Sequence, residues 1–131
     1  MKNRKVLVMV DWYAPGFKAG GPIRSAVNFA DQLEKDLDIY VLTTDRDLGD
    51  QMSYSDINAD QWTRRSEHRV FYASPSSLSW ASIRKIILEI APEHIYLNSM
   101  FSRYFAIYPL LMKRLGLLNG KLVLAPRGML R

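Results

Sequence analysis

The sequence predicts an α/β fold, a doubly wound parallel sheet of the Rossmann-like type with strand order 3-2-1-4-5. Two observations favour this fold class. Short, continuously apolar segments are typical of strands that are covered on both faces, and segments with apolar residues at helical spacing lie among them. Strands and helices that follow one another in this way most economically form a doubly wound sheet. The expected strands comprise residues 5–12, 38–44, 69–74, 93–97 and 121–125.

The first expected strand leads through a glycine-containing loop into the first expected helix. Pro22 suits the first helical position, because it has no N–H to lose there and its φ is already helical. Apolar residues then recur at helical spacing as far as Leu33, which gives the helix one buried stripe. Unpaired N–H groups and aligned peptide dipoles favour an anion at such a helix start. Gly20 and Gly21 have no Cβ, so a phosphate can approach their backbone closely; the alternative is that they only make the turn.

The remaining elements follow from turn residues and spacing. The polar stretch 46–68 is long for a loop in a compact domain, so it is expected to be functional, disordered or to contain a short element. Ser79 is the expected N-cap of a second helix, which Pro92 ends. A third helix is expected over about 104–115, with Pro109 either in its first turn or at a kink.

Polar residues are expected at the carboxyl edge of this sheet. Ligands of doubly wound sheets bind outside the carboxyl ends of the strands, where the strand order reverses. The reversal falls between the first and fourth strands, so the Gly20–Gly21 loop and Asn98–Ser99 are expected to flank one crevice. Asp45 and Arg127 end neighbouring strands at the same edge. Arg24, on the first helical turn, and Arg127 are candidate cations for an anionic ligand, or else exposed residues without that role.

Composition and charge exclude several classes of protein. The chain has 131 residues, which is enough for one domain with a core. It has no cysteine, so disulfides and thiolate sites are excluded, and this composition fits the reducing cytoplasm. The basic N-terminus has the charge pattern of a signal peptide, but Asp11 interrupts its apolar run. No apolar segment approaches the ~18 residues that span a bilayer. The net charge of +5 is dispersed, so the basic residues are either a solvated surface or a face for anionic substrates or lipid headgroups.

Motifs for other sites are absent. No nucleic-acid-binding module is recognisable. Neither GxGxxG nor GxxxxGK[ST] occurs, although Asp45 at the end of the second strand keeps a dinucleotide-binding domain as one reading. The third strand does not end in the aspartate that a phosphoacceptor receiver domain requires. No metal-ligand spacing is present, and we interpret His68 and His94 as structural histidines.

Three segments together carry a family resemblance: YAPGFKAGGPIRSAVNFADQL after the first strand, IYLNSMFS at the fourth, and LAPRGML at the end. In this order they resemble the N-terminal part of a family-4 glycosyltransferase of the GT-B fold, of the kind that assembles bacterial polysaccharides. The resemblance implies that residues 1–131 form an incomplete N-terminal, acceptor-side Rossmann-like domain, without the donor-binding C-terminal domain. It implies a retaining transferase that needs no metal or other cofactor.

The resemblance also implies roles for individual residues. Gly20 and Gly21 would approach the donor diphosphate, with Arg24 as a charge partner. The acceptor side would comprise Asp45, Asn98, Ser99 and Arg127. Many relatives have a histidine where this chain has Asn98, so no catalytic residue is assigned.

Partners and location follow from the same resemblance. A nucleotide diphosphate-sugar and a saccharide or lipid-linked saccharide acceptor would bind to the full-length enzyme, in the cytoplasm or at the inner face of the membrane. Because the chain stops at Arg131, inside a motif, we expect it to be inactive by itself and to self-associate. The alternative is a non-catalytic module that docks on anionic lipid or on a protein partner.

Overall fold

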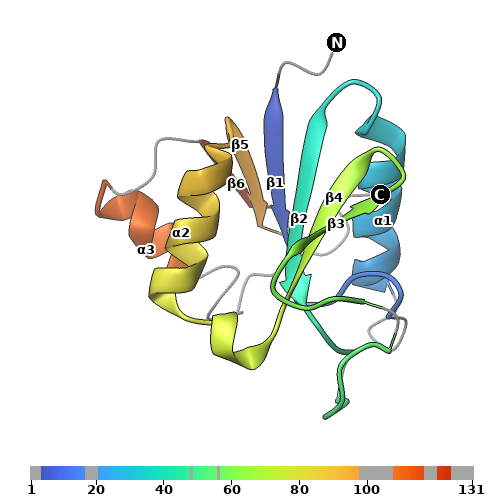
Figure 1. Cartoon of the computed structure of the whole chain (residues 1–131). Coiled ribbons are helices and arrows are strands. Elements are labelled where there is room, and N and C mark those ends of the chain that lie inside the picture. Colours follow the sequence, from blue (N-terminus) through green and yellow to red (C-terminus); the bar gives the residue numbers. More distant parts are fainter. Residues whose placement is uncertain are drawn as a thin grey trace.

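A sheet with helices on both faces forms the centre of the molecule in the computed structural model (Figure 1). The structure describes residues 4–16, 21–47, 49–55, 57–97, 108–116 and 121–124. The strands are β1 (Lys5–Met9), β2 (Asp38–Thr44), β3 (Trp62–Arg65), β4 (His68–Ala73), β5 (His94–Leu97) and β6 (Lys121–Leu124). The helices are α1 (Gly21–Leu33), α2 (Trp80–Ile90) and α3 (Tyr108–Arg114), with a 3₁₀ turn at Pro75–Ser77.

The sheet is mostly parallel, and its strand order is β3-β4-β2-β1-β5-β6. β1 pairs in parallel with β2 and β5, β2 with β4, and β5 with β6. These five strands succeed one another in the expected order, which confirms an α/β fold and is consistent with the Rossmann-like type. The complete sheet differs from the prediction, because β3 is added at the edge and pairs with β4 in the antiparallel direction.

The additional strand β3 lies within the polar stretch 46–68, which confirms the expectation that this stretch contains a short element. It has four residues, and only Trp62 among them is strongly apolar, so no period-2 hydrophobic pattern marks it. Its two-residue connection to β4, Ser66–Glu67, lacks the glycine typical of tight hairpins, although Ser66 has a positive φ of 56°. Arginines at an edge strand also discourage pairing with another chain. These features explain why the sequence did not reveal β3.

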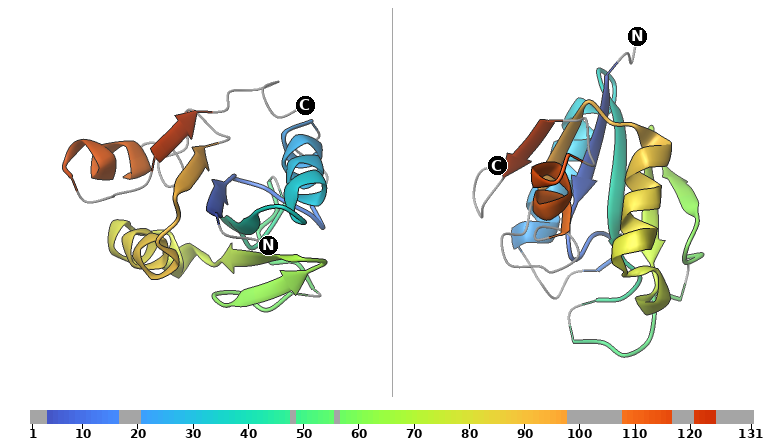
Figure 2. Two further views of the ribbon diagram at one scale, coloured as in Figure 1. Left: turned by 90° about the horizontal axis from the view of Figure 1, so that it is seen from above. Right: turned by 90° about the vertical axis from the view of Figure 1, so that its left-hand side faces the viewer.

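Two helical layers cover the sheet, with α1 on one face and α2 and α3 on the other (Figure 2). Alternate residues of β1 point to opposite faces, as the pleat requires. Val6 and Val8 pack in the cluster that contains Ala26 and Ala30 of α1. Leu7 and Met9 pack in the second cluster, with four buried isoleucines of α2 and Met112 of α3. Both faces of β1 are therefore buried, as its continuous apolar sequence predicts.

The observed helix ends agree with most of the expected ones. The side chain of Ser79 accepts a hydrogen bond from the Ser82 N–H at 3.2 Å, which confirms the predicted N-cap of α2. That helix ends at Ile90, and Ala91 adopts a left-handed conformation with φ 53°. Pro109 is the second residue of α3 and thus lies in its first turn. Within the described ranges, no helix combines the length and apolar character needed to cross a bilayer.

Candidate functional site

The candidate site lies at the carboxyl edge of the parallel strands, the lower edge in Figure 1. Three of the seven predicted site residues are described there. α1 begins at Gly21, Arg24 is exposed on its first turn, and Asp45 directly follows β2. The other four lie outside the described residues: Gly20, Asn98, Ser99 and Arg127. The structure thus places the start of α1 and Asp45 at one edge of the sheet.

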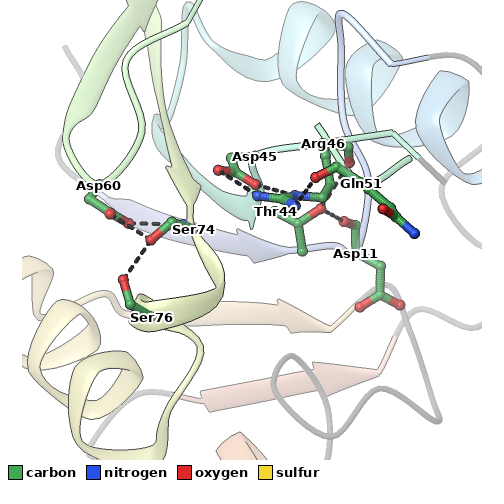
Figure 3. Close-up of polar contacts among 8 residues, drawn as sticks. All are labelled: Asp11, Thr44, Asp45, Arg46, Gln51, Asp60, Ser74 and Ser76. Carbon is green, nitrogen blue, oxygen red and sulfur yellow. Dashed lines mark hydrogen bonds and ion pairs between the residues drawn. The ribbon is translucent and has the colours of Figure 1, made fainter. Parts of the chain in front are cut away.

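Asp45 is held in place by several contacts. Its side chain is 4% exposed and pairs with the Arg46 guanidinium, with 2.8 Å between Nε and Oδ1 (Figure 3). Its N–H donates to the carbonyl of Ala73 at 3.1 Å, and its carbonyl accepts from the N–H of Tyr54 at 2.8 Å. The carboxylate that a dinucleotide ribose would require is therefore already paired. This arrangement argues against the dinucleotide-binding reading.

The ends of β1 and β2 are also tied to each other. The Thr44 hydroxyl lies 2.6 Å from the carbonyl oxygen of Asp11 and 3.2 Å from that of Arg46 (Figure 3). The Arg46 guanidinium bonds both the Asp45 carboxylate and the carbonyl of Gln51. This part of the edge is therefore held together by contacts within the chain. The sequence did not reveal these contacts, because most of them involve backbone carbonyls of other segments.

A second polar cluster lies at the end of β4, around Asp60. The Asp60 carboxylate accepts from the N–H of Ser74 at 2.9 Å and from its hydroxyl at 2.7 Å (Figure 3). Burial by itself raises the pKa of Asp60, but the hydrogen bonds from Ser77 and Ser74 outweigh it and lower that pKa. Asp60 is therefore ionised at neutral pH and fixes the segment between the end of β4 and the start of α2.

The segment that follows β1 is held by two tyrosines from distant parts of the chain. The Tyr54 hydroxyl donates to the carbonyl of Tyr13 at 3.3 Å, and the Tyr72 hydroxyl donates to the carbonyl of Ala14. The N–H of Gly16 donates to the carbonyl of Tyr13 at 2.9 Å, which closes a tight turn. These bonds anchor the first part of the β1–α1 connection, up to the last described residue before the predicted glycine loop.

A buried polar network lies between α1 and the sheet. The Tyr13 hydroxyl is 2.9 Å from Nε2 of His68, and Nδ1 of His68 is 2.7 Å from the Glu34 carboxylate. That carboxylate also accepts from the Ser66 hydroxyl at 2.8 Å and from the N–H of Glu67 at 3.0 Å. Both ring nitrogens of His68 are thus hydrogen-bonded, as expected of a structural histidine.

Part of this network has the residue types of a metal site. Ligand-type atoms of Asp31, Glu34 and His68 lie within 4.8 Å of one another, the single such group among the residues that the structure describes. However, both nitrogens of His68 and both oxygens of Glu34 already have hydrogen-bond partners. Glu34 follows the end of α1 and His68 begins β4, so the group is remote from the carboxyl edge. We assign it a structural role.

Glu34 should make the stability of the protein fall in acid. Burial by itself raises the pKa of Glu34, but the hydrogen bonds from His68, Ser66 and the Glu67 N–H outweigh it and lower that pKa. Because the folded-state pKa lies below the unfolded value of about 4.3, ionised Glu34 stabilises the fold above that pH. Its contribution is lost as the pH falls through the folded-state pKa. Urea unfolding between pH 7 and pH 3 should therefore show a smaller acid-dependent loss in Glu34→Gln, and an unchanged profile would contradict this assignment.

Comparisons with known proteins leave the family resemblance without independent support. Scans against protein-family models, curated proteins and solved structures returned no match. The glycosyltransferase assignment accordingly stays a prediction from the three sequence segments, and the fold does not decide it, because one fold hosts many functions.

Proposed function

We propose that this chain is the acceptor-side domain of a retaining glycosyltransferase that moves a sugar from a nucleotide diphosphate-sugar to a saccharide or lipid-linked saccharide. The observation that carries the proposal is the start of α1 at Gly21, immediately after the loop that leaves the carboxyl end of β1. Helix starts of this kind bind phosphates in parallel α/β sheets, because their N–H groups are unpaired and the helix dipole is positive there.

The chemistry of the proposed site follows from charge. In a sugar transfer from such a donor, the diphosphate leaves with negative charge, which backbone N–H groups at Gly20 and Gly21 would stabilise in the transition state. Arg24 is exposed on the first turn of α1, where its guanidinium adds a positive charge near the same group. Asp45, Asn98, Ser99 and Arg127 would hold the acceptor. By itself the chain is expected to lack turnover, because donor recognition requires the second domain.

Replacing Gly21 with valine tests the proposal in a polypeptide that joins this chain to its donor-binding domain. We expect about tenfold or greater loss of glycosyl transfer, because the added side chain keeps the diphosphate from the backbone. Gly116→Ala is the matched control, since Gly116 follows α3 and has open space around it. Because Gly116 has a positive φ of 75°, we expect this substitution to lower the stability of the protein but not the rate of glycosyl transfer. Full activity of the Gly21→Val variant would refute the loop assignment.

A second candidate function is docking on an anionic membrane surface, and exposed apolar residues favour it. Leu88 of α2 is 47% exposed. On the neighbouring α3, Leu111 is 44% exposed, and Leu115, which directly follows that helix, is 66% exposed. Basic residues accompany them on the same helices: Arg84, Lys85, Lys113 and Arg114. Exposed leucines beside cations are typical of surfaces that lie at the lipid interface.

Vesicle binding separates this candidate from the first. The 131-residue chain should co-sediment with vesicles that contain phosphatidylserine but not with phosphatidylcholine vesicles, and added salt should weaken binding. Replacing Leu111 and Leu115 with serine should reduce the bound fraction. Met52→Ser is the control, because Met52 is also highly exposed but lies in the 49–55 segment. No binding to the anionic vesicles would contradict the docking function and leave the transferase proposal untouched.

A further inference from the structure

A groove of about 370 Å³ lies between α2 and the β3–β4 hairpin. Its volume is within the ~300–1,000 Å³ of typical small-molecule sites. Trp62 and Phe71 line one side, and a stripe of α2 lines the other, since Ser82, Lys85 and Glu89 recur at helical spacing. Asp60 closes the end nearest the carboxyl edge of the sheet. The groove is thus beside the candidate site and adjoins it at Asp60, but neither the start of α1 nor Asp45 lines it.

The aromatic side of the groove is rigid. Trp62 and Phe71 are directly opposite each other on the two strands, with ring centroids 5.3 Å apart in an edge-to-face arrangement. Tyr40 of β2 contacts the Trp62 ring in the same manner, again at 5.3 Å. Rings held in this way line the groove with apolar surface, and binding to them loses little side-chain entropy.

The polar side of the groove has unused hydrogen-bonding capacity. The side chains of Gln61, Lys85 and Glu89 make no hydrogen bond or ion pair with another described residue, although all three line the groove. Together they offer amide, ammonium and carboxylate groups, which can donate to and accept from hydroxyls. Asp60 differs, because its carboxylate is already engaged by Ser74. The free groups are therefore available to a ligand, while Asp60 maintains the shape of the groove.

The charges and the ring together indicate the class of ligand. Asp60 and Glu89 are negative and Lys85 is positive, so the lining carries one net negative charge and disfavours phosphate or carboxylate ligands. A neutral pyranose presents an apolar C–H face, which fits the Trp62 ring, and a rim of hydroxyls, which fits the polar side. We propose that this groove binds a neutral sugar residue. That this sugar belongs to the acceptor rests on the proposed function, whereas the binding itself does not.

Direct titration of the 131-residue chain tests the inference without any transfer reaction. The chain has three tryptophans, which can be labelled with 5-fluorotryptophan and resolved by fluorine NMR. Mannotriose, maltotriose and triacetylchitotriose are the probes. We expect at least one to shift the Trp62 resonance saturably, and Gln61→Ala to weaken that binding about threefold to tenfold through lost hydrogen bonds. Trp62→Ala, which lacks this resonance and is therefore titrated by calorimetry, should weaken the binding about tenfold or more.

Controls locate the bound sugar. Trp80→Phe should leave the Kd unchanged, because Trp80 does not line the groove. Gln61→Ala still tests the groove if the Trp62→Ala variant misfolds, since Gln61 is exposed and outside the core. No saturable shift with any of the three saccharides would overturn the inference. So would a Kd that neither the Trp62 nor the Gln61 variant changes, because the sugar would then bind elsewhere. Failure here would leave glycosyl transfer, and hence the proposed function, unaffected.

Discussion

Replacing His68 with alanine is expected to lower the free energy of unfolding by about 3–5 kcal/mol. The side chain of His68 is fully buried and joins the Tyr13 hydroxyl to the Glu34 carboxylate. Its removal strips a buried carboxylate of one hydrogen-bond donor and leaves a buried hydroxyl without its partner, and it opens a cavity between α1 and the sheet. Urea unfolding at neutral pH measures the loss.

Two further variants divide this loss into its parts. Tyr13→Phe removes one hydroxyl and leaves Nε2 of His68 unpaired, so it should cost only about 1–3 kcal/mol. Gln32→Ala changes an exposed residue of α1 and should alter stability by less than about 0.5 kcal/mol. If His68→Ala costs no more than Tyr13→Phe, then the His68–Glu34 contact does not contribute to stability and the network is wrongly assigned.

The sequence allowed the regular helices and strands to be predicted, because burial of their faces gives the apolar residues a characteristic spacing. The continuous apolar run of β1 indicates that both of its faces are covered, and the helical spacing of apolar residues in α1 and α2 indicates which face of each helix is covered. β3 has no such pattern of apolar residues, since it is short and lies at an edge of the sheet. No sequence pattern indicates the Tyr13–His68–Glu34 network either, because its members come from three segments that only the folded chain brings together.

The candidate site was predictable to a similar degree. Strand ends and the start of α1 follow from the pattern, so the positions of Gly21, Arg24 and Asp45 near the carboxyl edge could be expected, while their roles stay a prediction. The pairing of Asp45 with Arg46 was not expected, although the two are adjacent. Adjacent residues in a loop can point in any direction, and the contacts of Arg46 with distant backbone decide this one. Local patterns therefore locate a site, while tertiary contacts determine which of its groups remain free.

A Gly16→Ala variant is expected to be destabilised by about 1–3 kcal/mol through crowding. A Cβ at Gly16 would lie 2.3 Å from the Tyr54 hydroxyl oxygen and 3.0 Å from both the Asp47 carboxylate and the Tyr13 carbonyl. The φ of Gly16 is outside the left-handed region, so the cost does not come from the backbone conformation. The Tyr54 ring cannot easily move away, because it packs edge-on against Tyr72 and its hydroxyl bonds the Tyr13 carbonyl.

A double-mutant cycle with Tyr54→Phe distinguishes crowding from other causes. Removing the hydroxyl deletes the closest contact, so Gly16→Ala should cost about 1 kcal/mol less in the Tyr54→Phe background than in the native one. Gly49→Ala provides the opposite control, since Gly49 has a φ of 79° and open space around it, and its cost should not depend on Tyr54. Equal costs of Gly16→Ala in the two backgrounds would mean that Tyr54 does not limit the space at Gly16.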